Sequence, residues 1–414
     1  MDTPIEPNSA AQSRDFPPSR AEALRRLDAF LPRAGRHYAN ERNADHGPER
    51  RGNVSVLSPY LRHRLLGEQE VVASVLQRYR LEQADKFVQE VLWRTYWKGW
   101  LELRPAVWAR YLETVESDRT RSRKDIALRA NIEAAEGGRT GIEGFDDWAR
   151  ELVDTGYLHN HARMWFASIW IFTLRLPWAL GADFFARHLL DADPASNTLS
   201  WRWVAGLQTA GKTYLARADN IARYTDGRFT PRGLADTAEA LVEPPLPAAS
   251  TLALRPQPAA DTRALLLAHP EDLDPLSALP AGLDLRAAVL ITSAADWPWG
   301  DRARAFVDGA CADTGQRLQQ AGLAVQALGA EAATADALAD LAAAHGTDAL
   351  LTPDAPVGPI SDLLNRLAPQ LQARGVSLTR VRRDWDSQFW PFANRGFFPF
   401  RERIPKQLRA LGLG

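Results

Sequence analysis

The stretch LLDADPASNTLSWRW, Leu189 to Trp203, places two acids two residues apart, followed by an asparagine and by two tryptophans that flank an arginine. Asp191 and Asp193 repel each other unless a cation or hydrogen-bond donors hold them. An Asp-x-Asp pair can begin a calcium loop, but Pro194 and Ala195 follow, and the later ligands and the turn glycine are missing. We therefore expect no metal here. A helix-initiating loop with surface acids and core tryptophans is the plain alternative.

The composition of the 414 residues is that of a globular chain with a formal net charge of −1. Any nucleic-acid binding must then depend on a local basic patch. Cys311 is the single cysteine, which excludes intramolecular disulfides, zinc ribbons and iron–sulfur clusters and favours a reducing compartment. The most apolar segment, Met164 to Leu174, is shorter than the roughly 20 residues of a membrane-spanning helix. We expect a cytoplasmic monomer without a membrane span.

The first part of the chain has a helical pattern. Residues 1–18 are polar and Pro-rich and predict a disordered lead-in, and residues 19–240 carry long segments with a 3.6-residue period and many tryptophans. Residues 241–261 are rich in Pro and Ala, which is typical of a linker.

Residues 262–414 alternate short apolar runs with Ala-rich helical stretches, which predicts a Rossmann-like α/β region with a parallel sheet. The fold class is therefore all-helical followed by α/β. No glycine-rich phosphate fingerprint follows the first run, so a nucleotide in this region is unsupported. The apolar runs are Arg263 to His269, Ala287 to Ser293, Leu323 to Leu328, Asp348 to Pro353 and Val376 to Val381.

The motif EVLWRTYW puts Glu90, Trp93, Arg94 and Trp97 on one face of a predicted helix. An acid, a base and two large aromatics on one stripe suit a half-buried polar pocket. They suit a surface salt bridge above a core stripe equally well, and the spacing alone does not separate the two.

The motif GYLHNHARMWFAS repeats this arrangement, with Asn160, Arg163 and Met164 on one face. Asn and Arg are costly to bury without partners, so they predict either a polar site or the exposed start of a helix.

Upstream, a Gly-, Asn- and Arg-rich segment ends in LSPYL. Ser58 before Pro59 resembles an N-cap with proline at the first helical position. Such a helix start offers backbone N–H groups to a phosphate, although many helices begin this way.

Taken together, these motifs resemble the flavin-binding helical domain of the photolyase/cryptochrome family from about Tyr38 to Phe229. LSPYL, GYLHNHARM, LLDADPASN and WRW occur in the order and at the spacings of that family. The resemblance implies an FAD cofactor folded into a U. The residues that it assigns to the cofactor are Tyr38, Val54, Ser55, Val56, Leu57, Ser58, Arg94, Arg163, Asp191, Asp193 and Asn197.

Within that set the resemblance gives each group a role. Tyr38 and the segment from Val54 to Ser58 meet the diphosphate, and Asp191 pairs with Arg163 beside the flavin. Asp193 contacts the ring edge. Asn197 lies beside flavin N5, where photolyases carry Asn, plant cryptochromes Asp and insect cryptochromes Cys.

The resemblance also implies a substrate, the cyclobutane pyrimidine dimer of UV-damaged DNA. Enzymes that act on (6-4) photoproducts carry histidines at the positions of Asn160 and Met164, and this sequence has neither. The implied function is light-dependent dimer repair by a deoxyribodipyrimidine photo-lyase; the alternative is a cryptochrome-like blue-light photoreceptor without repair. The pocket residues that the resemblance assigns, with Asn197 as a further catalytic residue, are Glu90, Trp93, Asn160, Met164 and Trp203.

His161 departs from the family, because repair enzymes usually carry an arginine there for DNA phosphates. Two basic groups can substitute for that contact, or they are ordinary solvated charges. These groups are Arg119, Arg121, Arg123 and Lys124, and Lys212, Arg217 and Arg223.

The family also carries a row of three tryptophans that bring electrons to the flavin. Trp201 matches the member next to the flavin and Trp178 the middle member, whereas the outer position falls near Asp125, where no tryptophan exists. We expect the row of electron-transfer tryptophans to be shorter than in the family, or to be rerouted through Trp170 or Trp148. Alternatively, these tryptophans are core residues only.

Finally, residues 262–414 resemble the family's antenna domain, placed after the flavin domain instead of before it, as in a circular permutation. The segment FANRGFFPFRERIPKQL looks like the part that closes near the flavin domain. The signature of the usual opening strand is degraded, so an antenna chromophore is doubtful. An unrelated α/β domain is the alternative.

Overall fold

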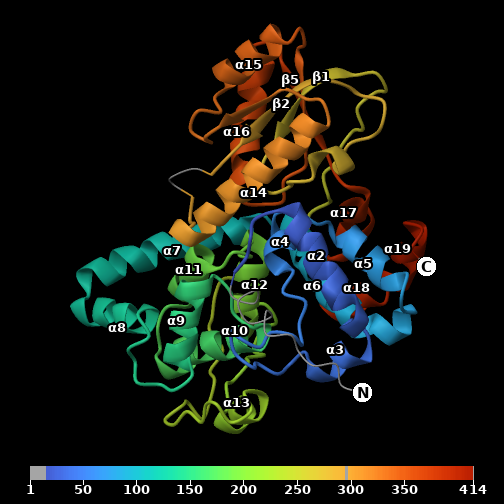
Figure 1. Cartoon of the computed structure of the whole chain (residues 1–414). Coiled ribbons are helices and arrows are strands. Elements are labelled where there is room, and N and C mark those ends of the chain that lie inside the picture. The colour runs from blue at the N-terminus through green and yellow to red at the C-terminus, as the bar shows by residue number, and fades with distance from the viewer. Residues whose placement is uncertain (1–14, 294–296, 414) are drawn as a thin grey trace.

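The structure is a computed structural model that describes residues 15–293 and 297–413 (Figure 1). Most of the predicted lead-in, residues 1–14, lies outside the described residues. Its last part does not match the prediction of disorder, because Phe16 is buried and stacks on Tyr157 with ring centroids 5.6 Å apart. An aromatic side chain with a partner in the core fixes this part of the chain.

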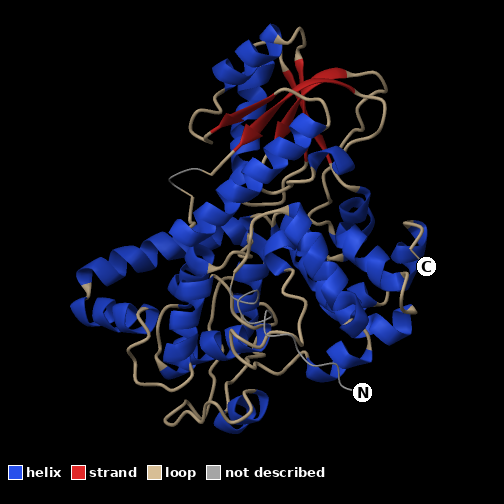
Figure 2. Cartoon of the chain, in the orientation of Figure 1, coloured by secondary structure: helices blue, strands red, loops and turns tan. Residues whose placement is uncertain are grey.

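Helices make up the described chain from Arg20 to Tyr224, as predicted (Figure 2). After α13, residues 225–262 contain neither helix nor strand, and the linker over 241–261 stays a prediction. The α-helices are α2 (Arg20–Phe30), α3 (Arg36–Glu41), α4 (Ser58–Arg62), α5 (Glu68–Leu76), α6 (Leu81–Glu102), α7 (Ala106–Lys124), α8 (Ile126–Glu136), α9 (Phe145–Thr155), α10 (Asn160–Ser168), α11 (Trp178–His188), α12 (Pro194–Val204) and α13 (Ala218–Tyr224). Leu31–Arg33 form a 3-10 turn, and α10 continues into a π-helical turn, Ile169–Thr173.

The predicted parallel sheet is confirmed. Its five strands are all parallel in the order β3-β2-β1-β4-β5, and each one overlaps a predicted apolar run. The strands are β1 (Arg263–Ala268), β2 (Asp284–Ile291), β3 (Val325–Leu328), β4 (Ala349–Pro353) and β5 (Ser377–Val381). The helices of this region are η3 (Pro275–Ala278), α14 (Asp301–Gln320), α15 (Ala335–Ala344) and α16 (Pro359–Gln372).

Helices cover both faces of the sheet. Leu266 and Ala268 of β1 belong to one hydrophobic core together with α14, whereas Leu265 and Leu267 belong to a second core with α15 and α16. Because successive strand residues point to opposite faces, a central strand between two cores must be apolar throughout. This explains the uninterrupted run LLLA.

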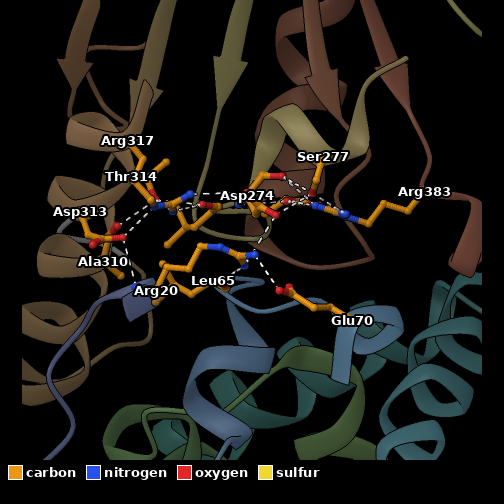
Figure 3. Close-up of polar contacts among 12 residues, drawn as sticks. Arg20, Leu65, Glu70, Asp274, Ser277, Ala310, Asp313, Thr314, Arg317 and Arg383 are labelled. Carbon is orange, nitrogen blue, oxygen red and sulfur yellow. Dashed lines mark hydrogen bonds and ion pairs between the residues drawn. The ribbon is translucent and has the colours of Figure 1, made fainter. Parts of the chain in front are cut away.

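The carboxyl edge of the sheet faces the helical region. In the loop after β1, Leu273 N–H donates to the His63 carbonyl at 2.8 Å. Figure 3 shows further polar contacts here: the Arg20 N–H of α2 donates to Asp313 of α14 at 3.3 Å, and the Arg20 side chain lies 3.8 Å from the Asp274 carboxylate. The two regions are therefore joined by directional contacts.

The last helices return to the helical region and pack on α6, as expected for the closing segment (Figure 1). They are α17 (Asp384–Phe389), η4 (Trp390–Phe392), α18 (Phe397–Arg401) and α19 (Ile404–Ala410). Gly99 of α6 permits this packing, because a Cβ at that position would lie 2.9 Å from the Trp390 Cα. The C-terminal segment of the described chain therefore packs on the helical region, although it follows the sheet in sequence.

Candidate functional site

The two acids of the opening stretch each have an arginine. Asp193 is the N-cap of α12 and accepts a hydrogen bond from the Ser196 N–H at 2.8 Å, while its other oxygen binds Arg94 of α6. Asp191 forms a two-pronged ion pair with Arg163 of α10, with N–O distances of 2.9 and 2.8 Å. The pairing of Asp191 with Arg163 is confirmed. Two arginines from two helices explain how the carboxylates lie so close together.

These pairs have buried acids and more accessible cations. The side chain of Asp191 is 2% exposed and that of Arg163 is 23% exposed; for Asp193 and Arg94 the values are 1% and 13%. The alternative of surface acids is therefore wrong. Burial raises the pKa of Asp191, but Arg163, with Arg94 and the Ser58 hydroxyl, outweighs burial and holds this pKa below its ordinary value. Asp191 is ionised at neutral pH, and Arg163 keeps surface for a ligand.

Helix α12 carries polar atoms that lack partners. Within the described part of the chain, the Ser196 hydroxyl, the Thr198 hydroxyl and the Trp201 indole N–H are buried without a hydrogen bond. The Asn197 amide donates to the Ala182 carbonyl of α11 at 2.8 Å, which fixes its orientation. Because buried polar groups nearly always have partners, these atoms on α12 are available to a bound ligand.

The segment before α4 departs from one prediction. Helix α4 begins at Ser58 with Leu57 as the N-cap and no side-chain cap, so Ser58 is the first helical residue and not the predicted cap. The reason is that Val56 adopts a positive φ of 53° and turns the chain one residue earlier. Val56 and Leu57 are buried, so this segment can offer a ligand mainly its backbone.

Tyr38 of α3 lies in the core of the helical region. Its ring meets Phe30 and Phe87 edge-on, with centroids 5.7 and 5.2 Å away. Burial raises the pKa of Tyr38 far above its ordinary value, and the nearby Glu90 adds to this effect. The predicted phosphate contact would use a neutral phenol.

On α6, Glu90 forms an ion pair with Arg42, and the two side chains are 32% and 26% exposed. Burial raises the pKa of Glu90, and Arg42 only partly opposes the rise. The structure shows a partly exposed ion pair at Glu90, and the half-buried polar pocket stays a prediction. Trp93 stacks face to face on Phe397 of α18, with centroids 3.5 Å apart and an interplanar angle of 10°.

The other predicted pocket residues lie on neighbouring helices. Asn160 is exposed at the start of α10, and Met164 one turn later is half-buried. Trp203 of α12 is half-buried and stacks on Tyr214, with centroids 5.7 Å apart. Helix α12 packs against both α6 and α10, so the structure brings these residues to adjacent helices.

His161 makes internal contacts. Its imidazole bonds to the Asn43 carbonyl at 3.0 Å and the Tyr214 hydroxyl at 3.3 Å and stacks on Trp165 with centroids 4.0 Å apart. Burial lowers its pKa. A neutral, internally bonded imidazole does not replace an arginine at a DNA phosphate.

The basic run at the end of α7 is largely paired with acids. Its ion pairs are Arg119–Asp183, Arg121–Asp118 and Arg123–Glu116. This pairing favours solvated charges over a DNA-binding strip.

The predicted electron path from Trp201 to Trp178 stays a prediction, and each of these tryptophans has its own aromatic neighbours. Trp201 packs edge-on to Trp170 with centroids 6.2 Å apart, and Gly181 of α11 allows this approach because a Cβ there would lie 2.3 Å from the Trp201 ring. Trp178 contacts Tyr111 at 5.8 Å, and Tyr111 contacts Trp108 at 5.3 Å.

The two tryptophans proposed for a rerouted path lie in different places. Trp170 touches Trp201, whereas Trp148 stacks on Trp165 and donates its indole N–H to Asp45. Tyr111 was missed by the sequence reasoning. Its signal is the Trp108–Tyr111 spacing of three residues on α7, which places both rings on one face.

A cavity of about 530 Å³ lies between α7, α11 and α12 and the loops at the carboxyl edge of the sheet. Asp193 and Asn197 line it, together with Trp108, Trp299 and Arg366. In open parallel sheets, ligands bind at this edge beside the point where the strand order reverses, here between β1 and β4. The expectation that an antenna chromophore is doubtful stays a prediction.

Among the described residues, no group of three or more His, Cys, Asp or Glu side chains is arranged to hold a metal. None of the helices in the described ranges is both long and apolar enough to cross a membrane.

The residues present fit an FAD cofactor. Arg163 and Arg94 are held by buried acids yet keep accessible surface, α12 has unsatisfied buried donors, and Trp93 and Trp203 are half-buried aromatics. Accessible cations suit a diphosphate, and unpaired polar atoms beside aromatic rings suit a flavin edge.

The comparisons with known proteins agree with this geometry. Residues 87–229 match the family model described as the FAD binding domain of DNA photolyase. Residues 87–229 of the helical region are thus similar to a photolyase-type FAD-binding domain, which supports FAD as the cofactor.

Curated relatives are named deoxyribodipyrimidine photo-lyase. The one from Streptomyces griseus is 34% identical over 181 residues, which is 41% of this chain and 38% of that protein. The one from Thermus thermophilus is 34% identical over 197 residues, 48% of this chain and 45% of that protein. The chain thus spans less than half the length of these relatives.

Two solved structures are similar over half of the chain. A bacterial class III photolyase from Agrobacterium tumefaciens is 26% identical with a TM-score of 0.43, covering 55% of this chain and 47% of that one. A cryptochrome from Synechocystis is 23% identical with a TM-score of 0.40, covering 50% and 43%.

Proposed function

We propose that this chain is a light-driven enzyme that repairs cyclobutane pyrimidine dimers in UV-damaged DNA. The observation that carries the proposal is the set of accessible residues on α6, α10 and α12 beside the Arg163–Asp191 pair. Those residues are Glu90, Trp93, Asn160, Met164 and Trp203. The names of the curated relatives support the same activity.

Bound FAD in its reduced form supplies, after light absorption, the single electron that splits the dimer. The protein supplies binding and orientation: Arg163, held by Asp191, and Arg94, held by Asp193, act as fixed cations for the cofactor. Asn197, with its amide fixed by the Ala182 carbonyl, presents its side chain at a constant angle.

The dimer itself must leave the base stack, and the aromatic faces of Trp93 and Trp203 receive it. Glu90 stands at the same surface. Since burial raises the pKa of Glu90, its carboxyl keeps a proton to higher pH than an exposed glutamate. A protonated Glu90 donates a hydrogen bond to a dimer carbonyl and stabilises the negative charge that develops there.

In this proposal, electrons reach the cofactor through Trp178 and then Trp201. The contacts of Trp178 with Tyr111 and of Tyr111 with Trp108 extend this path toward the cavity beside α7. The parallel sheet and the return of the last helices to α6 support an antenna-like α/β unit in residues 262–414.

Irradiation of the FAD-loaded chain with an oligonucleotide that carries one thymine dimer tests the function. We expect thymines to be restored under blue light and not in the dark. Glu90→Ala should lower the repair yield, because it removes the hydrogen-bonding carboxyl, while Glu113→Ala on the exposed side of α7 should match the parent. A parent chain that binds FAD but restores no thymine refutes the repair function.

A second candidate is a photoreceptor without repair. His161 is bonded internally instead of facing DNA, and Phe397 covers one face of Trp93. For this candidate, blue light should change the flavin spectrum without restoring any thymine in the same experiment.

A further inference from the structure

The stack between Trp93 and Phe397 is the closest aromatic contact in the described chain. Its centroid distance of 3.5 Å is shorter than the 4.5–7 Å usual for aromatic pairs, so the two rings overlap almost completely. Tyr96 adds an edge contact to Phe397 at 5.4 Å. One face of the Trp93 indole is therefore covered, yet the residue stays half-buried and not fully buried.

Phe397 belongs to a segment that is fixed independently of this stack. Trp385 donates its indole N–H to Thr95 at 2.9 Å, and the Tyr96 hydroxyl donates to the Arg395 carbonyl at 2.7 Å. Arg104 donates to the Asn394 carbonyl at 2.9 Å. These bonds attach the residues that precede α18 to α6 and the turn after it, independently of the stack.

We propose that Phe397 is a positioning residue for dimer recognition, which acts by holding the Trp93 ring in the orientation that receives the dimer. This inference rests on the proposed function, since it deepens the role of Trp93. It makes the end of the chain part of the substrate site, although 304 positions separate the two residues in the sequence.

The physical basis is preorganisation. A tryptophan ring on a partly exposed helix face samples several rotamers, and binding must then select one of them at an entropic cost. A ring fixed by a full stack has already met that cost in the folded protein. Loss of the stack should weaken dimer binding without a change in FAD content, because the ring contacts of Phe397 are with Trp93, Tyr96 and Phe400.

The first test measures the ring itself and needs no DNA. The protein is labelled with 5-fluorotryptophan, and the ¹⁹F line of Trp93 is assigned by its loss in Trp93→Phe. Phe397→Leu, which keeps an apolar side chain but removes the flat ring, should shift and broaden this line. Phe398→Ala is the matched control, since Phe398 is the next residue and is 75% exposed.

The second test measures binding to an oligonucleotide with one thymine dimer and to its undamaged counterpart. Phe397→Leu should weaken dimer binding by about two- to tenfold, the range expected for one aromatic pair, and Phe397→Tyr should restore it. In a Trp93→Ala background the same substitution should have no further effect.

The outcomes separate the two ideas. A parent chain without preference for the dimer refutes the proposed function, whatever the ¹⁹F spectra show. A parent with that preference, combined with an unmoved Trp93 line in Phe397→Leu or an equal loss of binding in the Trp93→Ala background, refutes the positioning role.

Discussion

Two of the sets of buried carboxylates in the described chain differ in how far their partner arginines are exposed to solvent. At the joint between the helical region and the sheet, Arg62 pairs with Glu271, and Arg64 pairs with Asp386; the arginines are 1% exposed and the acids at most 4%. At the proposed flavin site, Arg163 is 23% exposed, whereas its partner Asp191 is as deeply buried as the acids of the joint. At the joint both the arginine and the acid of each pair are buried, whereas at the site only the acid is buried.

The difference separates a structural role from a binding role. An ion pair buried on both sides is costly to desolvate, and it holds only because several groups satisfy it. Arg64 meets this condition with Glu68, Asp272 and Asp386 around it. The partly exposed Arg163 instead keeps N–H donors for a further partner, which is what an anionic cofactor requires.

The largest effect is expected at the joint. Arg64→Met should lower the free energy of unfolding by about 3–5 kcal/mol, because it leaves buried carboxylates without their cation. Chemical denaturation of the purified chain measures this. Arg123→Met is the matched control: that arginine and its partner Glu116 are both more than 60% exposed, and exposed pairs contribute about 0–1 kcal/mol. Equal losses in the two variants would contradict the contrast between sealed and open pairs.

A different loss is expected at the site. Asp191→Ala should abolish FAD retention while lowering stability less than Arg64→Met does, because the freed Arg163 can turn toward solvent. The absorbance ratio of flavin to protein after gel filtration measures retention. Asp219→Ala, which removes a fully surface-located partner of Arg217, should retain FAD like the parent. Full flavin occupancy in Asp191→Ala would contradict the assignment of the pair to the cofactor.

The site was more predictable from the sequence than the joint. The motif around Asp191 and the motif around Arg163 each have a fixed spacing, and their resemblance to a known family brought them together correctly. The parallel sheet was also accessible, since a strand buried on both faces must be a continuous apolar run, as Leu265 to Ala268 is.

The joint had no such signal. In LSPYLRHRLL, Arg62 and Arg64 look like ordinary charges after a short helix, and nothing local shows that Glu271 and Asp386 bury them. The stack of Phe397 on Trp93 was equally hidden. Contacts between distant segments depend on how the two regions pack, and a single sequence carries no periodicity that encodes this. The error at Ser58 is of another kind, because a residue with positive φ at Val56 moved the helix start by one position.

The smallest expected effect concerns a carboxyl group at the joint that has no full partner. Glu102, at the end of α6, accepts the Val357 N–H from the loop after β4. Burial raises its pKa to about 7, and the neighbouring Asp354 adds to the rise, while Arg382 and Arg255 oppose it. The folded state therefore binds a proton that the unfolded state has already released, in the window from about pH 4.5 to 7.

The sign of the pH dependence follows from this uptake. As pH rises through that window, Glu102 should reduce the stability of the parent chain, and above about pH 7 the reduction should be constant. Glu102→Gln keeps an acceptor for Val357 but cannot ionise. The variant should be more stable than the parent at pH 8, by on the order of 1 kcal/mol after allowance for solvent screening, and nearly equal to it at pH 5. Thermal unfolding at the two pH values measures this, with the exposed Glu113→Gln expected to show no such difference. If Glu102→Gln is no more stable than the parent at pH 8, Glu102 ionises in the folded protein at little cost. The edge of the joint would then be accessible to water, as the arginine of the Arg163–Asp191 pair is.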